Sequence, residues 1–290
     1  MKVLLTGAIG FIGRHVLADL RQQGIETVAV GRTRPADYEG DFITADLLRS
    51  ETPALVLDRA RPTHLIHLAW YTEHGAYWTS PLNLRWLDAS VRLTEAFCAS
   101  GGKKLIAAGT CAEYDWTIGY CREDSSPLAP TTLYGTAKDA TRRLLATVCE
   151  AAGVQFTWGR VFIPYGEGED ERRLIPSLTA VFEGWREPFG VNGAAYRDFL
   201  NVKDVARAFT CLLRPEARGV YNISSGQPTR IADLVLRIAD ALGGDVRRVL
   251  DLAPSRLGEP ELLLGDNRKL KSLGWQPIHH WSSTLLPGKR

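Results

Sequence analysis

The sequence has no long hydrophobic run, no excess of either charge and no regular spacing among its cysteines. No apolar stretch approaches the ~18 residues that a membrane-spanning helix needs. The apolar part of the first few residues is too short for a secretory signal peptide. The five cysteines, at positions 98, 111, 121, 149 and 211, are odd in number and scattered. They predict reduced thiols in a cytoplasmic protein rather than a disulfide framework or a zinc site.

Charge also excludes several partners. The chain of 290 residues carries 35 basic and 33 acidic residues, a net charge of +2. A net charge this small does not indicate a protein that binds nucleic acid or a membrane surface. His67 and His74 do not stand at the spacing of metal ligands relative to cysteine or carboxylate residues, so no metal site is expected.

What the sequence does contain is an alternation of short apolar runs and amphipathic stretches. The runs are apolar enough to be strands buried on both faces, and the alternation predicts an α/β fold with a Rossmann-type doubly wound parallel sheet. Strands are expected at 3–6, 27–30, 64–69, 104–108 and 156–162, and helices at 11–23, 82–100, 134–152, 175–183, 202–213 and 231–242. The rhythm changes after residue 163. We therefore expect a dinucleotide-binding domain over 1–163 and a smaller C-terminal α/β substrate lobe over 164–290, with the chain free to cross back between them.

A glycine-rich segment follows the first expected strand. Gly7, Gly10 and Gly13 form a G-x-x-G-x-x-G run that opens the first helix. Glycine is needed there for a tight turn, for close approach of the backbone to a pyrophosphate and for helix–strand packing. The helix N-terminus adds free N–H groups that favour an anion. The segment predicts a dinucleotide site, although the spacing alone also fits a plain strand–helix turn.

The end of the second expected strand bears on the choice of cofactor. An acidic residue there would bind the ribose of NAD, but the sequence has Gly31 and Arg32. A glycine leaves room for a 2′-phosphate and an arginine is a bidentate donor to it. NADP(H) is therefore favoured as the cofactor, with NAD(H) as the alternative. Arg32 could instead lie in a solvated loop without binding a cofactor. Asp46 is a candidate for the adenine edge.

Two further residues carry acid–base chemistry. Tyr134 and Lys138 are four positions apart and share one face of a helix. A phenol with a pKa near ~10 needs a neighbouring positive charge to act as a base at neutral pH. Thr110 stands at the end of the strand expected at 104–108, at the carboxyl edge of the sheet, where ligands of α/β proteins bind, and its hydroxyl can donate to a carbonyl oxygen.

Together these residues resemble the extended short-chain dehydrogenase/reductase family, in its NAD-dependent epimerase/dehydratase branch. The resemblance covers nearly the whole chain. Its landmarks are residues 6–13, 67–69, Thr110, Tyr134, Lys138, 160–162, 165–166, 197–206, 221–226, Arg256, Asp266 and 273–277.

The resemblance implies a role for each site residue. Thr110, Tyr134 and Lys138 are the catalytic triad. The cofactor is expected against Gly7, Gly10, Phe11, Ile12, Gly13, Arg32, Asp46, Leu47, Leu68, Ala69, Tyr134, Lys138 and Val161. The substrate, a nucleotide-diphosphate sugar, is expected against Trp70, Thr110, Cys111, Glu113, Arg197 and Arg256. Family members commonly form homodimers through the helices at 82–100 and 134–152.

Departures from the family pattern narrow the activity. Sugar 4,6-dehydratases carry an acidic pair after the triad threonine, where this chain has Cys111 and Ala112, so a dehydratase is disfavoured. Ile163 stands where many relatives have a substrate-binding asparagine. The preferred interpretation is a 4-ketoreductase of deoxysugar biosynthesis that uses NADPH. The alternative is a nucleotide-sugar epimerase that keeps its cofactor bound, and a non-catalytic, redox-sensing binding module comes third. Residues 70–78 are unusually aromatic and predict a pocket wall, a lid or part of the core.

Overall fold

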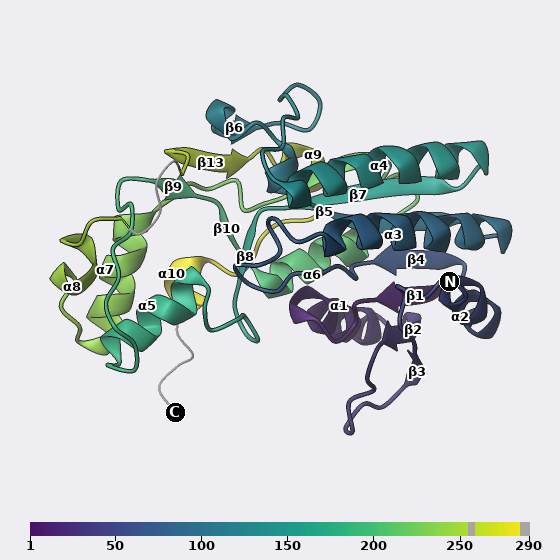
Figure 1. The fold of residues 1–290 in the computed structure, drawn as a ribbon, viewed down its shortest axis with the longest axis horizontal. Coiled ribbons are helices and arrows are strands. Elements are labelled where there is room, and N and C mark those ends of the chain that lie inside the picture. Colours follow the sequence, from purple (N-terminus) through teal and green to yellow (C-terminus); the bar gives the residue numbers. More distant parts are fainter. Residues whose placement is uncertain (255–258, 285–290) are drawn as a thin grey trace.

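The fold is built on one seven-stranded sheet, seen on the right of the computed structural model in Figure 1. The structure describes residues 1–254 and 259–284. The strand order is β3-β2-β1-β4-β5-β7-β11 and every pair in it is parallel. Its strands are β1 (Lys2–Thr6), β2 (Glu26–Gly31), β3 (Asp41–Thr44), β4 (His64–His67), β5 (Lys104–Thr110), β7 (Gln155–Val161) and β11 (Gly219–Ile223). The predicted Rossmann-type fold class is confirmed.

Helices cover both faces of this sheet because its strands are apolar on both sides. On β1, Val3 and Leu5 face one core and Leu4 faces the other. The first core is closed by α1 (Phe11–Gln22) and α6 (Val202–Cys211). The second is closed by α2 (Thr52–Ala60), α3 (Leu82–Ala99) and α4 (Leu133–Ala151). Alternate side chains of each strand thus serve different layers, as the pleat requires.

The second lobe lies at the carboxyl end of the sheet, on the left of Figure 1. Its core is formed chiefly by α5 (Leu174–Phe182) and α7 (Ile231–Leu242), with α8 (Arg247–Leu250) beside them. Two small sheets join the lobes, one of order β10-β8 and one of order β12-β9-β13-β6. Their strands are β6 (Tyr120–Cys121), β8 (Ile163–Tyr165), β9 (Tyr196–Arg197), β10 (Phe199–Asn201), β12 (Thr229–Arg230) and β13 (Leu262–Gly265). The remaining elements are η1 (Cys111–Glu113), η2 (Trp116–Ile118), α9 (Arg268–Lys271) and α10 (Trp281–Thr284).

A division at residue 163 does not separate the two lobes. Beyond that residue, α6 packs against α1 and β11 pairs with β7, so both belong to the large sheet. In the other direction, β6 leaves the first half of the chain to pair with β13. The chain returns to the large sheet because α6 and β11 follow β8, β9 and β10 in the sequence.

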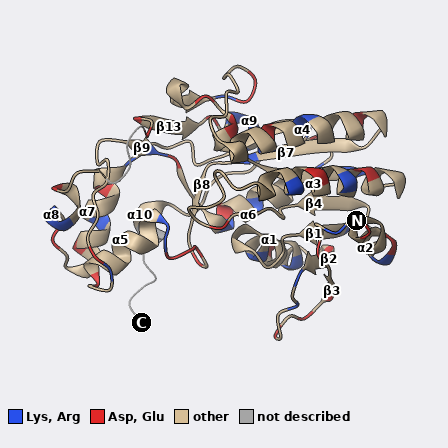
Figure 2. Cartoon of the chain, in the orientation of Figure 1, with Lys and Arg blue, Asp and Glu red and all other residues tan. Residues whose placement is uncertain are grey.

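Element boundaries lie within two residues of the expected ones at most ends. Strand β4 ends at His67 rather than at residue 69, and strand β5 continues to Thr110 rather than ending at residue 108. The helix α2 was not expected. In the part of the chain that the structure describes, no helix is long and apolar enough to cross a membrane. Figure 2 shows both signs of charge interspersed along outer helices such as α3 and α4.

Candidate functional site

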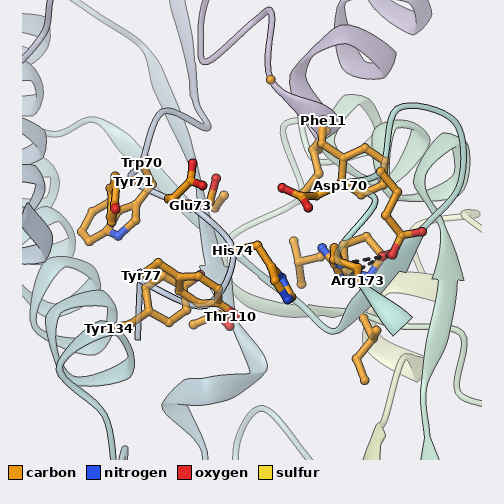
Figure 3. Close-up of a pocket in the computed structure, with 18 of the residues that line it drawn as sticks. Phe11, Trp70, Tyr71, Glu73, His74, Tyr77, Thr110, Tyr134, Asp170 and Arg173 are labelled. Carbon is orange, nitrogen blue, oxygen red and sulfur yellow. Dashed lines mark hydrogen bonds and ion pairs between the residues drawn. The ribbon is translucent and has the colours of Figure 1, made fainter. Parts of the chain in front are cut away.

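A large cavity lies between the carboxyl ends of the parallel strands and the second lobe. Its volume is about 1630 Å³, more than the upper end of the range of roughly 300–1,000 Å³ common for single small-molecule sites. It lies where the strand order reverses between β1 and β4, the place at which doubly wound sheets bind ligands. Figure 3 shows side chains from both lobes pointing into it.

Most of the residues expected from the sequence line this cavity. They are Gly7, Gly10, Phe11, Ile12, Gly13, Arg32, Asp46, Leu47, Leu68, Ala69, Trp70, Thr110, Cys111, Tyr134, Lys138, Val161 and Arg197. Glu113 does not line it. Arg256 falls outside the described residues.

The glycine loop forms a cradle made of backbone. Gly7 has φ +71°, and a Cβ there would lie 2.8 Å from the Ala69 nitrogen. A Cβ on Gly13 would lie 1.9 Å from the Gly7 carbonyl oxygen. The N-cap of α1 is Gly10, which offers no side-chain cap to the first N–H groups of the helix. The loop therefore fits the pyrophosphate of a dinucleotide, which would take the place of a cap.

The far end of the cradle is formed by β2 and the loop after β3. Arg32 is exposed at the cavity edge. The carboxylate of Asp46 accepts a hydrogen bond from the Leu48 nitrogen at 3.1 Å, which fixes the turn there. Leu47 is buried and presents an apolar surface. These residues could hold the adenosine half of a dinucleotide.

The triad residues meet at the opposite end of the cavity. Thr110 ends β5, and Tyr134 lies in the first turn of α4, which is capped by a hydrogen bond from the Gly135 nitrogen to the Thr132 hydroxyl. The Thr110 side chain lies close enough to Tyr134 to lower the pKa of its phenol. Lys138, one turn further along α4, donates to the Ala108 carbonyl oxygen at 2.9 Å. All three side chains are buried, so helix α4 and strand β5 hold them in fixed positions.

The electrostatics of the pair differ from the sequence-based expectation. Burial is the main cause that raises the pKa of Tyr134 above its usual value, and the neighbouring Tyr77 adds to it, while the Thr110 side chain opposes it. Burial also lowers the pKa of Lys138 to about 7. Desolvation thus sets the direction of the pKa shift in both groups of the protein alone. A further positive charge is needed before Tyr134 can act as a base at neutral pH.

Glu113 lies elsewhere than the sequence analysis predicted. It was expected to bind substrate, but its carboxylate is fully buried and faces the interior. It accepts from the Arg160 Nε at 2.7 Å, the Trp158 Nε1 at 3.0 Å and the Thr110 backbone nitrogen at 2.8 Å. The side chain therefore has a structural role, because it holds the backbone that carries the triad threonine.

An aromatic strap, residues 70–78, covers the triad. In Figure 3, Tyr77 lies next to Tyr134, and Trp70 and Tyr71 lie further along the same side of the cavity. The ring of Tyr77 lies 4.9 Å and that of Trp78 5.7 Å from the ring of Tyr134, both edge-on. The Lys138 ammonium lies 3.8 Å from the centre of the Trp70 ring. The strap is a wall of the site rather than part of the core.

The second lobe contributes cationic side chains that the sequence reasoning missed. Arg172, Arg173 and Arg186 line the cavity together with the expected Arg197. Arg172 forms an ion pair with Glu73 of the strap at 2.8 Å, which links the two lobes. Arg197 donates to the Pro260 carbonyl oxygen at 2.7 Å and forms an ion pair with Glu259 at 3.0 Å. Residues 167–173 are highly charged and resemble a solvated loop, so no sequence signal set these arginines apart.

His67 holds two polar side chains together in the core. His67 is buried between the Thr6 hydroxyl at 2.7 Å and the Ser90 hydroxyl at 2.9 Å, and burial lowers its pKa to about 3, so its ring is neutral. Within residues 1–254 and 259–284, no group of three or more His, Cys, Asp or Glu side chains is gathered as metal ligands.

Known proteins resemble this chain over its whole length. Residues 3–224 match the model of the NAD dependent epimerase/dehydratase family. A UDP-glucose 4-epimerase of Corynebacterium glutamicum is 27% identical, with 99% of this chain and 94% of the relative covered. One from Streptomyces lividans is 25% identical, with 95% and 91% covered.

Solved structures agree with these relatives. The Thermus thermophilus UDP-glucose 4-epimerase in complex with NAD has 25% identity and a TM-score of 0.84 over 98% of this chain and 96% of its own. MoeE5 in complex with UDP-glucose and NAD has 28% identity and a TM-score of 0.86 over the same shares. Both complexes contain NAD, so the expectation that NADP(H) is favoured was wrong. An exposed Arg32 is compatible with a ribose hydroxyl as well as with a phosphate.

Proposed function

Because the chain belongs to the NAD dependent epimerase/dehydratase family, we propose that it is an NAD-dependent epimerase that inverts C4 of a hexose carried on a nucleoside diphosphate. The observation that carries this proposal is the end-to-end match to UDP-glucose 4-epimerases, together with a buried Thr110–Tyr134–Lys138 cluster in the cavity. The size of the cavity supports it too, since a dinucleotide and a nucleotide sugar must fit side by side.

This proposal reverses the order of the two activities considered from the sequence. The 4-ketoreductase was preferred because Arg32 favoured NADPH, a reductant consumed at every turnover. Once NAD replaces NADP(H), that reason disappears. An epimerase needs no net reductant, and the relatives support this second interpretation.

The chain's own residues account for the proton transfer. Bound NAD would supply the hydride acceptor and donor for C4, and its oxidised ring would supply the positive charge that Tyr134 needs. Tyr134 in its phenolate form takes the proton of the C4 hydroxyl and gives it back when the ketone is reduced. Thr110 donates a hydrogen bond to the same oxygen. Lys138, held by the Ala108 carbonyl, would bind the ribose of the cofactor.

The remaining polar groups suit the two diphosphates. The free N–H groups at the start of α1 would hold the pyrophosphate of NAD. Arg197 at the cavity wall, with Arg256, would hold the diphosphate of the substrate, because a guanidinium binds phosphate oxygens in a bidentate manner. Glu259, now paired with Arg197, would have to give up this contact.

Product analysis tests the proposal. The purified protein with NAD is incubated with UDP-galactose that carries deuterium at C4, and the products are analysed by NMR. We expect the C4 epimer with deuterium retained at C4 and without net consumption of reduced cofactor. Stoichiometric consumption of NADPH with a 4-keto sugar, and no epimer, would support the reductase instead.

A homodimer is part of the proposal. Leu84 on α3 and Leu144 on α4 are 55% and 44% exposed, and the two helices pack side by side (Figure 1). A second copy could cover both leucines in a four-helix bundle. Light scattering should give twice the mass of 32.0 kDa, and replacement of both leucines by glutamate should give the monomer.

A further inference from the structure

The ammonium group of Lys138 is buried, which disfavours its charged form. An ammonium has three donors, and one of them goes to the Ala108 carbonyl oxygen at 2.9 Å. The carboxylate of Glu113 attracts the charge, but this carboxylate is already paired with Arg160 at 2.7 Å. The charge of Lys138 therefore needs a further source of stabilisation inside the site.

The ring of Trp70 lies where it can provide this stabilisation. The Lys138 Nζ is 3.8 Å from the centre of that ring. A cation within about 6 Å of the centre of an indole is attracted by the negative face of the ring, and the attraction is strongest where water is excluded. Unlike a carboxylate, the ring favours the cation without adding a negative charge that would repel the phenolate of Tyr134.

The orientation of the ring is fixed from behind. The Trp70 Nε1 donates to the Asn83 side-chain oxygen at 2.9 Å. Asn83 is fully buried, and its amide donates to the Tyr77 carbonyl oxygen at 2.7 Å and to the Ser80 carbonyl oxygen at 2.9 Å. Rotation of the ring would leave the buried amide oxygen without its donor, which is costly. The ring is thus held against the ammonium.

Three different elements bring these groups together. Trp70 follows the carboxyl end of β4, Ala108 lies on the neighbouring strand β5, and Lys138 lies on α4. The sequence analysis expected Trp70 to contact the substrate, and its side chain does line the cavity. Its Nε1 and its ring are, however, both engaged within the protein, by Asn83 and by Lys138.

From this geometry, and resting on the proposed function, we propose that Trp70 is a positioning residue whose ring keeps the Lys138 ammonium charged and in place beside the cofactor ribose and Tyr134. A neutral amine at this point would no longer attract the phenolate that takes the proton of the C4 hydroxyl. Trp70 acts through Lys138 and does not need to touch the sugar.

The titration of Lys138 can be followed separately from that of its neighbours. Burial lowers its pKa to about 7. Burial raises the pKa of Tyr134 and lowers that of His67 to about 3, so neither of these groups changes its charge near neutral pH. Glu73 and His74 of the strap line the same cavity, so the measurement is repeated in Glu73→Gln and in His74→Gln.

Fluorination of the ring tests the proposal without changing its shape. Trp70 is replaced by mono-, di- and tetrafluorotryptophan through nonsense suppression in the full-length protein, with and without NAD. Fluorine withdraws negative charge from the ring face but leaves the volume almost unchanged, so water is not admitted. The pKa of Lys138 is read from the NMR signal of isotope-labelled lysine, which is identified by its loss in Lys138→Met. We expect the pKa to fall with each step, by about one unit for tetrafluorotryptophan.

Trp116 provides the matched control. It lines the same cavity, and its Nε1 is likewise used within the protein, by the Cys111 carbonyl oxygen at 2.9 Å. Its ring contacts the ring of Trp78 instead of an ammonium. The same fluorinated series at position 116 should leave the pKa of Lys138 unchanged. A pKa that does not respond to fluorination at position 70, or that responds equally at position 116, would overturn the proposal.

The pH dependence of kcat links the contact to the reaction. Charged Lys138 is the active form, so the rate of UDP-galactose epimerisation should fall as pH rises through its pKa. This fall should begin about one pH unit lower when Trp70 is tetrafluorinated, and an unmoved profile would overturn the positioning role. Epimerisation combined with a pKa of Lys138 that ignores fluorination would leave the proposed function standing and reject the role of Trp70. A pKa that responds in a protein without epimerase activity would reject the proposed function but keep the contact between ring and ammonium.

Discussion

Removal of the Glu113 carboxylate should destabilise the protein severely, although Glu113 does not touch the cavity. Its side chain is 0% exposed and that of Arg160 is 1% exposed, with 2.7 Å between their charged atoms. In Glu113→Ala the guanidinium stays buried with no opposite charge, and the Trp158 Nε1 and the Thr110 nitrogen lose their acceptor. Breaking a buried ion pair from one side costs about 3–5 kcal/mol.

Thermal unfolding gives the most direct reading of this loss. At about 2.1 cal/mol/K per residue, 290 residues give an unfolding entropy of about 0.6 kcal/mol/K, so the Tm should fall by roughly 5–8 °C. Calorimetry measures the Tm, and urea unfolding checks the free energy. A control is Asp245→Asn, which breaks the exposed pair with Arg247 and should leave the Tm unchanged.

The double variant separates charge from packing. Glu113→Gln combined with Arg160→Met removes both charges and keeps most of the volume, so it should recover more than half of the loss seen in Glu113→Gln alone. A Glu113→Ala protein within about 1 kcal/mol of the wild type, or a double variant no more stable than Glu113→Gln, would refute the reasoning.

Two further predictions concern the cavity. In Gly13→Ala the new Cβ would lie 1.9 Å from the Gly7 carbonyl oxygen, so calorimetry should show NAD binding weakened about 100-fold. The control Gly193→Ala, whose Cβ would meet a flexible neighbour at 3.3 Å, should bind NAD normally. An unchanged Kd of Gly13→Ala for NAD would contradict the role of the glycine loop as a cradle. Burial raises the pKa of Glu169 to about 7, against the opposing charge of Arg173, so the folded state keeps a proton that the unfolded state loses and stability falls as pH rises from about 4.5 to 7. Glu169→Gln should therefore raise the urea midpoint at pH 8 but not at pH 4, and equal midpoints for wild type and variant at pH 8 would rule this out.

The sequence patterns predicted those parts of the site that depend on local order along the chain. The glycine loop follows a strand and opens a helix within residues 2–13, and the Tyr134–Lys138 spacing is set by one helical turn. Such features need no knowledge of distant contacts. The parallel sheet followed from the alternation of apolar runs with helices for the same reason.

Other parts depend on contacts between distant residues and could not be derived in this way. Glu113 meets Arg160 from 47 positions away, and Arg172 meets Glu73 from 99 positions away. No periodicity links such residues. Arg32 was misread because a guanidinium after β2 suits solvent as well as a phosphate, and the solved complexes of similar proteins contain NAD.

We propose that Tyr134 moves the proton at C4 in the cofactor-loaded enzyme, and the Tyr134→Phe variant measures this role most directly. The variant loses one oxygen atom and keeps its ring against Tyr77 and Trp78, so its Tm and its affinity for NAD should match those of the wild type. Its kcat for epimerisation should fall about 100-fold or more. A variant that binds NAD and epimerises the sugar at the wild-type rate would contradict the account.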